Sequence, residues 1–178
     1  MTAQFSDSII YNGELYGIAN EPFEEYLKTR QDIQYDGYCS ACWRGYIAKW
    51  EIIEDKLFLI GLNEFQFGKE EPIIKEKTYN FNDIFPEQDK VFADWFSGEL
   101  KIPQGEVLKY IHACYASIYE KEVHLDIKEG VVVGEREVDN RGKVFDDDTD
   151  IKWMHKDLKK PSWGQRVRMY FLKRGKNN

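Results

Sequence analysis

Residues 43–63 have the sequence WRGYIAKWEIIEDKLFLIGLN, in which Glu54 and Asp55 separate two runs rich in apolar residues. The first run alternates between apolar and polar residues, and a period of two is typical of a half-buried β-strand. The second run is apolar at nearly every position, which favours a strand in the middle of its sheet. The stretch therefore predicts a β-hairpin around which the rest of the chain is organised.

A two-residue turn would determine which side chains face each other across this hairpin. Counting outward from the turn, the predicted pairs are Ile53 with Lys56, Ile52 with Leu57, Trp50 with Leu59, and Ala48 with Gly61. Glu-Asp lacks the glycine that two-residue turns prefer, so a longer turn with another register is the alternative.

Further turn signals extend this pattern in both directions along the chain. Asn-Gly at residues 12–13 predicts a hairpin over residues 8–18, and Glu-Gly at residues 129–130 predicts another over residues 116–137. A last alternating strand is predicted at residues 166–172, RVRMYFL, with arginines on its polar side. Strands that follow one another through short turns pair in antiparallel fashion.

The remaining regular segments are a short helix and one more strand. Apolar residues at helical spacing follow Asn20, which predicts a helix that is capped by Asn20 and ends near Arg30. Residues 91–102 predict a strand that stops at Pro103, because proline cannot donate a hydrogen bond to a strand ladder. Residues 106–115 fit a helix and a strand about equally well.

Length and composition agree with one globular domain. The chain has 178 residues, of which 15% are aromatic and 32% are charged, and this length can bury a core without disulfides or metals. We therefore expect residues 1–178 to form a single α+β domain that is mostly antiparallel β. The sheet is expected to be curved, or sandwich-like or barrel-like, with one or two short helices.

Charge is distributed unevenly along the chain. Residues 152–178 contain nine lysines and arginines and one acidic residue, whereas the whole chain has a net charge of −7. The body is therefore strongly acidic, and the C-terminal segment from about residue 152 is basic. An acidic body favours a basic protein partner and disfavours nucleic acid.

The N-terminal residues do not resemble a secretion signal. Residues 1–12 have no basic start followed by an apolar run, and no apolar stretch of the chain approaches about 18 residues. We therefore expect a cytoplasmic protein with no membrane partner; the pattern does not predict its oligomeric state.

Three segments carry a resemblance to a known group of proteins. They are WRGYIAKWEI at residues 43–52, DWFSGELKIPQG at residues 94–105, and YASIYEK at residues 115–121. These segments are similar to parts of small uncharacterised bacterial proteins. The resemblance implies a bacterial origin, and it implies no activity, cofactor or site residue.

Four cysteine and histidine residues could provide a zinc site. Cys39 and Cys42 have the C-x-x-C spacing that lets two thiolates bind one metal ion, and His112 and Cys114 could complete a tetrahedral site. The last two side chains point the same way only if residues 110–115 form a strand. The alternative is that the cysteines are small core or loop residues and that no cofactor is bound.

An acidic segment offers a second candidate for a cation. Asp146, Asp148 and Asp150 fall at ligand positions 1, 3 and 5 of a calcium-binding loop, and Asp157 falls at position 12. Ile151 occupies the position where the sharp turn of such a loop requires glycine. The competing interpretation is therefore a solvated acidic loop.

Catalysis has one candidate pair of residues. Glu120 and Glu122 would point the same way on a strand, about 7 Å apart, which suits acid/base catalysis on a glycosidic bond. Trp43, Trp50 and Trp95 could stack on a sugar or line a ligand-binding barrel, although sheet cores use aromatic residues routinely. The chain has three histidines, and it has neither a nucleophile elbow nor a phosphate loop.

The sequence thus favours a non-catalytic protein-binding module of an inhibitor or immunity type, whose acidic body engages a basic protein. Two other classes stay open. One is a ligand-binding barrel or glycan-directed enzyme that uses interior aromatics with Glu120 and Glu122, and the other is a zinc-stabilised module. An enclosed pocket with convergent polar groups would favour the first of these, and an assembled cysteine and histidine site would favour the second.

Overall fold

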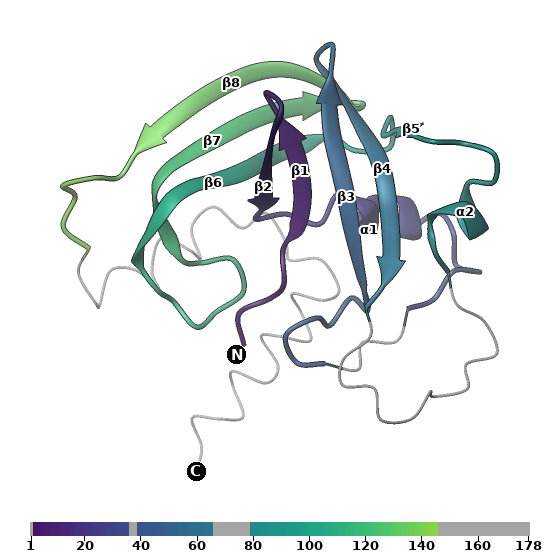
Figure 1. Cartoon of the computed structure of the whole chain (residues 1–178), viewed down its shortest axis with the longest axis horizontal. Coiled ribbons are helices and arrows are strands. Elements are labelled where there is room, and N and C mark those ends of the chain that lie inside the picture. The colour runs from purple at the N-terminus through teal and green to yellow at the C-terminus, as the bar shows by residue number, and fades with distance from the viewer. Residues whose placement is uncertain (1, 36–38, 66–78, 146–178) are drawn as a thin grey trace.

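The structure is a computed structural model that describes residues 2–35, 39–65 and 79–145. Within these residues the chain forms one curved sheet with the strand order β2-β1-β3-β4-β8-β7-β6, and β5 pairs with β4 outside this path (Figure 1). The elements in chain order are β1 (Asp7–Tyr11), β2 (Glu14–Ile18), α1 (Phe23–Leu27), β3 (Tyr46–Ile53), β4 (Lys56–Glu64), α2 (Phe81–Ile84), β5 (Val91–Phe92), β6 (Gly98–Lys109), β7 (Ile118–Lys128) and β8 (Val131–Asp139). All pairs are antiparallel except β1 with β3. The expected α+β fold with a curved, mostly antiparallel sheet and two short helices is confirmed.

The central hairpin forms as the sequence predicts, with one correction to its register. Ile53 pairs with Lys56 and Trp50 pairs with Leu59, as expected from a two-residue turn. The register then shifts between Lys49 and Trp50, so that Ala48 lies opposite Leu62 instead of Gly61. A β-bulge adds one residue to one strand, and counting pairs outward from a turn cannot detect it.

All three predicted hairpin turns are two-residue turns with left-handed backbone. Asn12 and Gly13 have φ values of 51° and 80°, and Glu129 and Gly130 have values of 47° and 77°. Glu54 and Asp55 adopt the same conformation, with φ values of 48° and 58°, although neither is glycine. The longer turn considered for the central hairpin is therefore wrong, because strand pairing imposes the tight turn on these two residues.

Asn20 does not cap α1, and its actual contacts join the two ends of the sheet. The N-cap of α1 is Pro22, without a side-chain hydrogen bond. The Asn20 amide oxygen instead accepts a hydrogen bond from the Lys101 N–H at 2.6 Å, and the Ala19 N–H donates to the Lys101 carbonyl at 2.9 Å. These bonds hold the chain after β2 against β6, although β2 and β6 form no ladder among the described residues.

The predicted single strand over residues 91–102 is wrong at both points: β5 and β6 are separate strands, with residues 93–97 between them, and β6 continues through Pro103 to Lys109. The peptide groups of Lys101 point away from β7, toward Ala19 and Asn20. Pro103 follows two residues later with the same orientation, so its missing N–H removes no bond to β7. The ambiguous residues 106–115 continue the strand to Lys109 and then form a loop, and they contain no helix.

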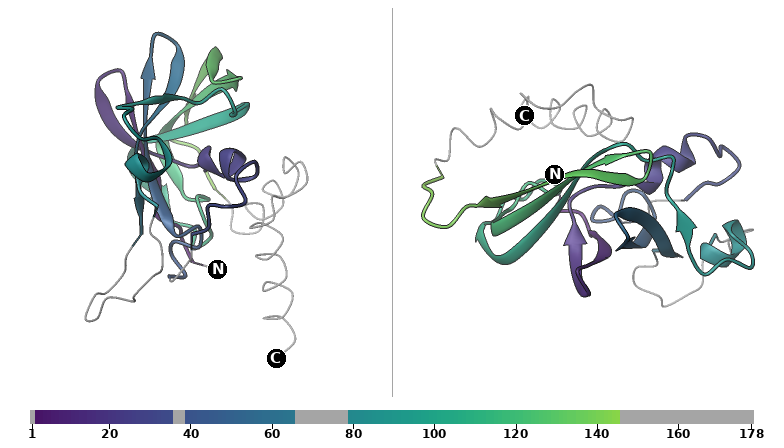
Figure 2. Two further views of the ribbon diagram at one scale, coloured as in Figure 1. Left: turned by 90° about the vertical axis from the view of Figure 1, so that its right-hand side faces the viewer. Right: turned by 90° about the horizontal axis from the view of Figure 1, so that it is seen from above.

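The core lies on the concave side of the sheet and includes residues from both helices. Phe23 of α1 packs edge-on against Tyr46. Phe81, the first residue of α2, packs against Phe85, which follows the last residue of α2. Seen from above, strands β6 to β8 and the hairpins β1–β2 and β3–β4 form two parts of the curved sheet set at an angle (Figure 2). The buried cluster consists of Ile9, Tyr11, Ile18, Phe23, Tyr46, Ala48, Trp50, Leu57, Leu59, Leu62, Phe81, Phe85, Ala93, Phe96, Leu100, Ile102, Val123, Leu125 and Ile127. No helix in the described part of the chain is long and apolar enough to cross a membrane.

Candidate functional site

Among the described residues, one edge of β8 is paired throughout and the other is paired only at its start. β8 pairs with β7 along its whole length, but it meets β4 at a single position, Lys56 with Val131. The last hydrogen bond on that side runs from the Val132 N–H to the Asp55 carbonyl at 2.8 Å. Beyond this point β8 runs away from β4 (Figure 1), and no other strand in the described residues pairs with this side of it.

The hydrogen bonds of the hairpin show which peptide groups lie on the free edge. The Asn140 N–H donates to the Glu120 carbonyl of β7 at 2.8 Å, so Asn140 faces β7. Backbone groups alternate between the two edges along a strand, and the peptide groups of Glu135, Glu137 and Asp139 therefore point away from β7. Three consecutive outward-facing residues of this edge are acidic.

The side chains of these residues lie on the core side of the sheet, at the margin of the core. Glu135 is directly opposite Leu125, and Glu137 is directly opposite Val123, both of which are buried. The Tyr11 hydroxyl reaches across from β1 and donates a hydrogen bond of 2.7 Å to the Glu135 carboxylate. Both glutamates are exposed, so the core ends where β8 separates from β4.

Glu135 and Glu137 lack a cationic partner in the described part of the chain. Asp139 is bound by the Arg141 guanidinium at 2.5 Å, which holds the pKa of that carboxyl well below its usual range. Arg136 points to the opposite face, where it pairs with Glu99. We call Glu135, Glu137 and Asp139 of β8 the acidic edge. It combines backbone hydrogen-bonding groups and two negative charges that have no strand or cation as partner in the described ranges.

Tyr11 makes the stability of this region sensitive to high pH. Burial, with the hydrogen bond and charge of Glu135, raises the pKa of Tyr11 from 10.0 to about 12. Between these values the unfolded chain loses the phenol proton while the folded protein keeps it, so the free energy of unfolding falls as pH rises. Tyr11→Phe is expected to lose less stability than the wild type between pH 10 and 12, as measured by urea unfolding. Parallel stability curves for the two proteins over this range would contradict the assignment.

The opposite face of β6, β7 and β8 carries a compact cluster of ion pairs. His124 lies between two carboxylates, with Nδ1 2.9 Å from Glu99 and Nε2 3.3 Å from Glu122. Lys101 pairs with Glu122 at 2.8 Å, and Arg136 pairs with Glu99. Burial disfavours the charged form of Glu99, but the hydrogen bonds from His124 and Arg136 hold its pKa below the usual value. The charges in this cluster satisfy one another.

The candidate catalytic pair lies on this same outer face of β7. The Glu122 carboxylate belongs to the ion-pair cluster, and the Glu120 carboxylate accepts a hydrogen bond from the Glu106 N–H at 3.2 Å. Of the aromatic residues considered for stacking, Trp50 is fully buried and Trp95 packs against Tyr26 at a ring distance of 4.8 Å. The two glutamates and these aromatic residues therefore do not line a common cleft.

The predicted zinc ligands are not brought together as a metal-binding group. Cys39 and Cys42 have free thiols and are paired only through their backbones, in an isolated β-bridge before β3, and the buried Cys42 thiol contacts the Tyr46 carbonyl at 3.4 Å. His112 is exposed on the loop before β7, and its Nδ1 lies 2.9 Å from the Tyr110 hydroxyl. The described ranges contain no group of three or more cysteine, histidine, aspartate or glutamate side chains placed to hold a metal ion, the set with Cys114 included. The aspartates of the candidate cation loop, Asp146, Asp148 and Asp150, lie outside the described residues.

A buried polar network joins β1 to the start of β3. Asp7 is fully buried, and its carboxylate accepts hydrogen bonds from Arg44 at 2.6 Å and from the Trp50 indole at 3.2 Å. Arg44 also donates to the Tyr115 hydroxyl at 2.8 Å, and that hydroxyl donates to Glu21 at 3.0 Å. The Asp7 and Arg44 side chains are closed off from solvent, so we assign the network to stability and not to ligand binding.

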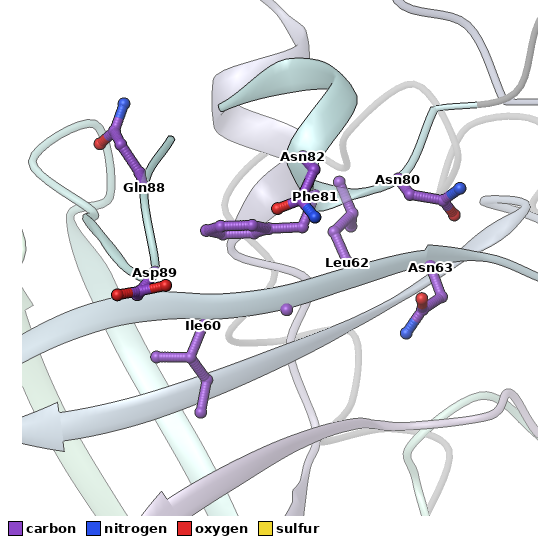
Figure 3. Close-up of a pocket in the computed structure, with 9 residues that line it drawn as sticks. Ile60, Leu62, Asn63, Asn80, Phe81, Asn82, Gln88 and Asp89 are labelled. Atoms are coloured by element: carbon purple, nitrogen blue, oxygen red, sulfur yellow. The ribbon is translucent and has the colours of Figure 1, made fainter. Parts of the chain in front are cut away.

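The surface has a shallow depression of about 340 Å³ between β4 and α2. Leu62 and Phe81 form its apolar floor, and the polar residues of its rim are Asn63, Asn80, Asn82, Gln88 and Asp89. Figure 3 shows the amides of Gln88 and Asn80 pointing away from Phe81, so the polar groups do not converge on one point. A small-molecule site combines an apolar surface with convergent polar groups, and this depression lacks the second feature.

Comparison of the chain with protein-family models, with curated proteins and with solved structures gives no match. The site must therefore be interpreted from its own geometry.

The acidic edge was not among the residues that the sequence singled out. The signal was present, because Glu135, Glu137 and Asp139 alternate within the predicted third hairpin. Their importance depends on the unpaired side of β8, which cannot be read from a local pattern.

Proposed function

We propose that this protein is a non-catalytic binding module that takes an extended basic segment of a protein partner as an added strand on the acidic edge of β8. The observation that carries the proposal is the outward-facing backbone of Glu135, Glu137 and Asp139, next to two carboxylates without a cationic partner in the described part of the chain. Strand addition to a free sheet edge supplies main-chain hydrogen bonds, and the alternate side chains supply specificity.

The spacing of the charges supports a partner with alternating basic residues. Residues two apart on a strand are separated by about 7 Å and lie on the same face. A partner strand with lysine or arginine at every second position would place each positive charge directly opposite one carboxylate. Such cross-strand pairs of opposite charge contribute about 0.2–1 kcal/mol each.

The same charges argue against association between two copies of this edge. Edge strands of soluble proteins commonly carry charged residues because like charges placed opposite each other oppose pairing. Two copies of the acidic edge would bring carboxylates together, whereas a basic segment would relieve their repulsion. The occupant of the edge is therefore a chemically different, basic strand.

The biological role of this binding and the place where it acts are also proposals. A small protein that binds and covers a basic segment of another protein would act as an inhibitor or an immunity-type protein. We propose that this activity takes place in the cytoplasm of a bacterium; the resemblance of residues 43–52, 94–105 and 115–121 to small bacterial proteins supports the bacterial origin.

A peptide of alternating lysine and threonine provides a direct test. We expect it to bind the full-length protein at low salt and to bind more weakly as salt is added, because exposed charges are screened. Removing both uncompensated charges with Glu135→Gln and Glu137→Gln together is expected to weaken binding about tenfold, from two lost charge pairs. Fluorescence anisotropy of the labelled peptide measures the dissociation constant.

A matched control has the same change in net charge at other exposed acids. Glu106→Gln with Glu129→Gln removes two carboxylates that lie outside the acidic edge, and it is expected to change the affinity less than twofold. Equal weakening by the two double variants would mean that the peptide senses only overall charge. That result would contradict a site on β8.

A proline substitution separates strand addition from charge attraction alone. The Glu137 N–H points away from β7, so Glu137→Pro removes a donor from the free edge and none from the β7 ladder. We expect this variant to fold and to lose peptide binding even at low salt. Unchanged binding would show that the peptide does not add as a strand.

A further inference from the structure

One segment of this chain has the chemistry expected of the strand that occupies the acidic edge. Residues 166–172, RVRMYFL, lie outside the described residues, and they alternate Arg166 and Arg168 with apolar residues. Valine, tyrosine and phenylalanine in this run favour a strand. The segment belongs to residues 152–178, which hold nine basic residues and one acidic residue.

The chain is long enough to bring this segment to β8. Residues 141–165 connect Asn140, next to the end of β8, to Arg166, and this length of chain spans up to about 80 Å when extended. The acidic edge itself, from Glu135 to Asp139, is about 14 Å long. A tether of this length keeps the segment near the edge at an effective concentration on the order of millimolar.

We propose that residues 166–172 occupy the acidic edge as a strand antiparallel to β8, with Arg168 opposite Glu135 and Arg166 opposite Glu137, and so compete with the basic partner. This register pairs both carboxylates that have no cationic partner in the described residues, whereas Asp139 already has Arg141. The inference rests on the proposed function, because it assigns regulation to the same edge.

The consequence is a self-blocked binding site. A partner must displace the chain's own strand, so its apparent affinity is reduced by the fraction of molecules in which the edge is open. If about nine molecules in ten are blocked, the apparent dissociation constant is about tenfold higher than that of the open edge.

A disulfide trap in the full-length chain tests the contact without any partner. Residues that exchange hydrogen bonds across an antiparallel pair have Cα atoms about 5.5 Å apart, within the range that a disulfide spans. We expect Glu137→Cys with Arg166→Cys to form an intramolecular disulfide, located by peptide mapping so that links to the native cysteines are recognised. The control, Val138→Cys with Arg166→Cys, places the first cysteine on the other face of β8 and is expected to stay reduced. Equal yields in the two proteins, or no link in either, would argue against the contact.

A binding measurement tests the competition independently of that register. Reversing the charge of the segment with Arg166→Glu and Arg168→Glu is expected to tighten binding of the lysine–threonine peptide about tenfold, because the internal competitor is lost. The control, Lys159→Glu with Lys160→Glu, makes the same change in net charge outside the segment and is expected to change the affinity less than twofold. Equal tightening by both variants would overturn the inference.

The outcomes separate this inference from the proposed function. If the peptide binds the acidic edge but the arginine variants change nothing and no disulfide forms, the self-blocking strand is wrong and the binding edge stands. If the disulfide forms but no peptide binds the variant with Arg166→Glu and Arg168→Glu, the chain occupies its own edge and the partner-binding function is wrong.

Discussion

Arg44→Met is expected to lower the free energy of unfolding by about 3–5 kcal/mol, because it leaves a charge without its partner in the interior. The Asp7 carboxylate is fully buried, and the Arg44 guanidinium at 2.6 Å is its only neighbouring cation in the described residues. The remaining donors are neutral, namely the Ala48 N–H at 2.9 Å and the Trp50 indole at 3.2 Å. Neutral hydrogen bonds do not replace the lost opposite charge.

The pH dependence of this variant gives a second signature. Burial already raises the pKa of Asp7, against the opposing effect of Arg44, so the folded protein holds this proton more tightly than the unfolded chain. Ionised Asp7 therefore lowers the free energy of unfolding. This loss is fully present above the pKa of Asp7 in the folded protein and disappears as pH falls below its pKa in the unfolded chain, near 3.8. We expect the stability difference between Arg44→Met and the wild type to shrink as pH is lowered.

Arg30→Met is the matched control for this prediction. Arg30 pairs with Asp32 at 2.8 Å, but both side chains are exposed, and exposed ion pairs contribute about 0–1 kcal/mol. Urea unfolding at neutral pH measures both variants against the wild type. Similar small losses for the two variants would show that Arg44 does not compensate a buried charge.

Gly130→Ala is expected to lower the free energy of unfolding by about 3 kcal/mol, from backbone strain and overlap together. Gly130 has φ of 77°, where residues with a side chain are strained. A Cβ atom at this position would lie 2.7 Å from the Ala93 carbonyl oxygen. That contact cannot relax easily, because the Gly130 N–H donates to Phe96 and its carbonyl accepts from Leu57, at 2.9 and 2.8 Å.

Gly13→Ala separates the two causes. Gly13 occupies the same position of its hairpin turn with φ of 80°, but a Cβ atom there would meet nothing within 4 Å. Only the backbone strain remains, and we expect a loss of about 1 kcal/mol. Thermal and urea unfolding of the two variants measure the difference, and equal losses would mean that the close approach of Ala93 is not a constraint.

These two predictions concern the part of the molecule that holds β8 in place. The Gly130 turn anchors the start of β8 to β4 and to Phe96, in the segment between β5 and β6, and the buried network holds β1, whose Tyr11 contacts Glu135. The acidic edge lies beyond both features, so charge variants of Glu135 and Glu137 are expected to fold normally. Loss of binding in those variants would then report on the edge itself.

Much of the fold could be predicted because it depends on residues close in the sequence. The three hairpins follow from alternating apolar residues and two-residue turns, and the half of the central hairpin nearest its turn, up to the pair Trp50–Leu59, has the register that the turn at Glu54 and Asp55 predicts. Local steric preferences and the period of two act over only a few residues, so they are visible without any tertiary information.

Apart from the bulge in the central hairpin, the predictions that failed concern contacts between segments distant in the sequence. Asn20 and Pro103 have the local signature of a helix cap and a strand end, but both are placed by the edge of β6. Cys39 and Cys42 have a metal-binding spacing, but no further ligand of the predicted set joins them in the described structure. Short motifs give the same signal whether or not the fold supplies their distant partners.

The sequence by itself determined the three hairpins, their two-residue turns and the alternation of Glu135, Glu137 and Asp139 along β8, because these depend on local backbone geometry and side-chain period. Only the tertiary structure decided that β8 separates from β4 after Val132, which leaves these peptide groups without a neighbouring strand in the described residues. It also decided that Asp7 and Arg44 meet in the interior. Strand order and edge exposure are set by the packing of the whole sheet against its core, and no single segment encodes them.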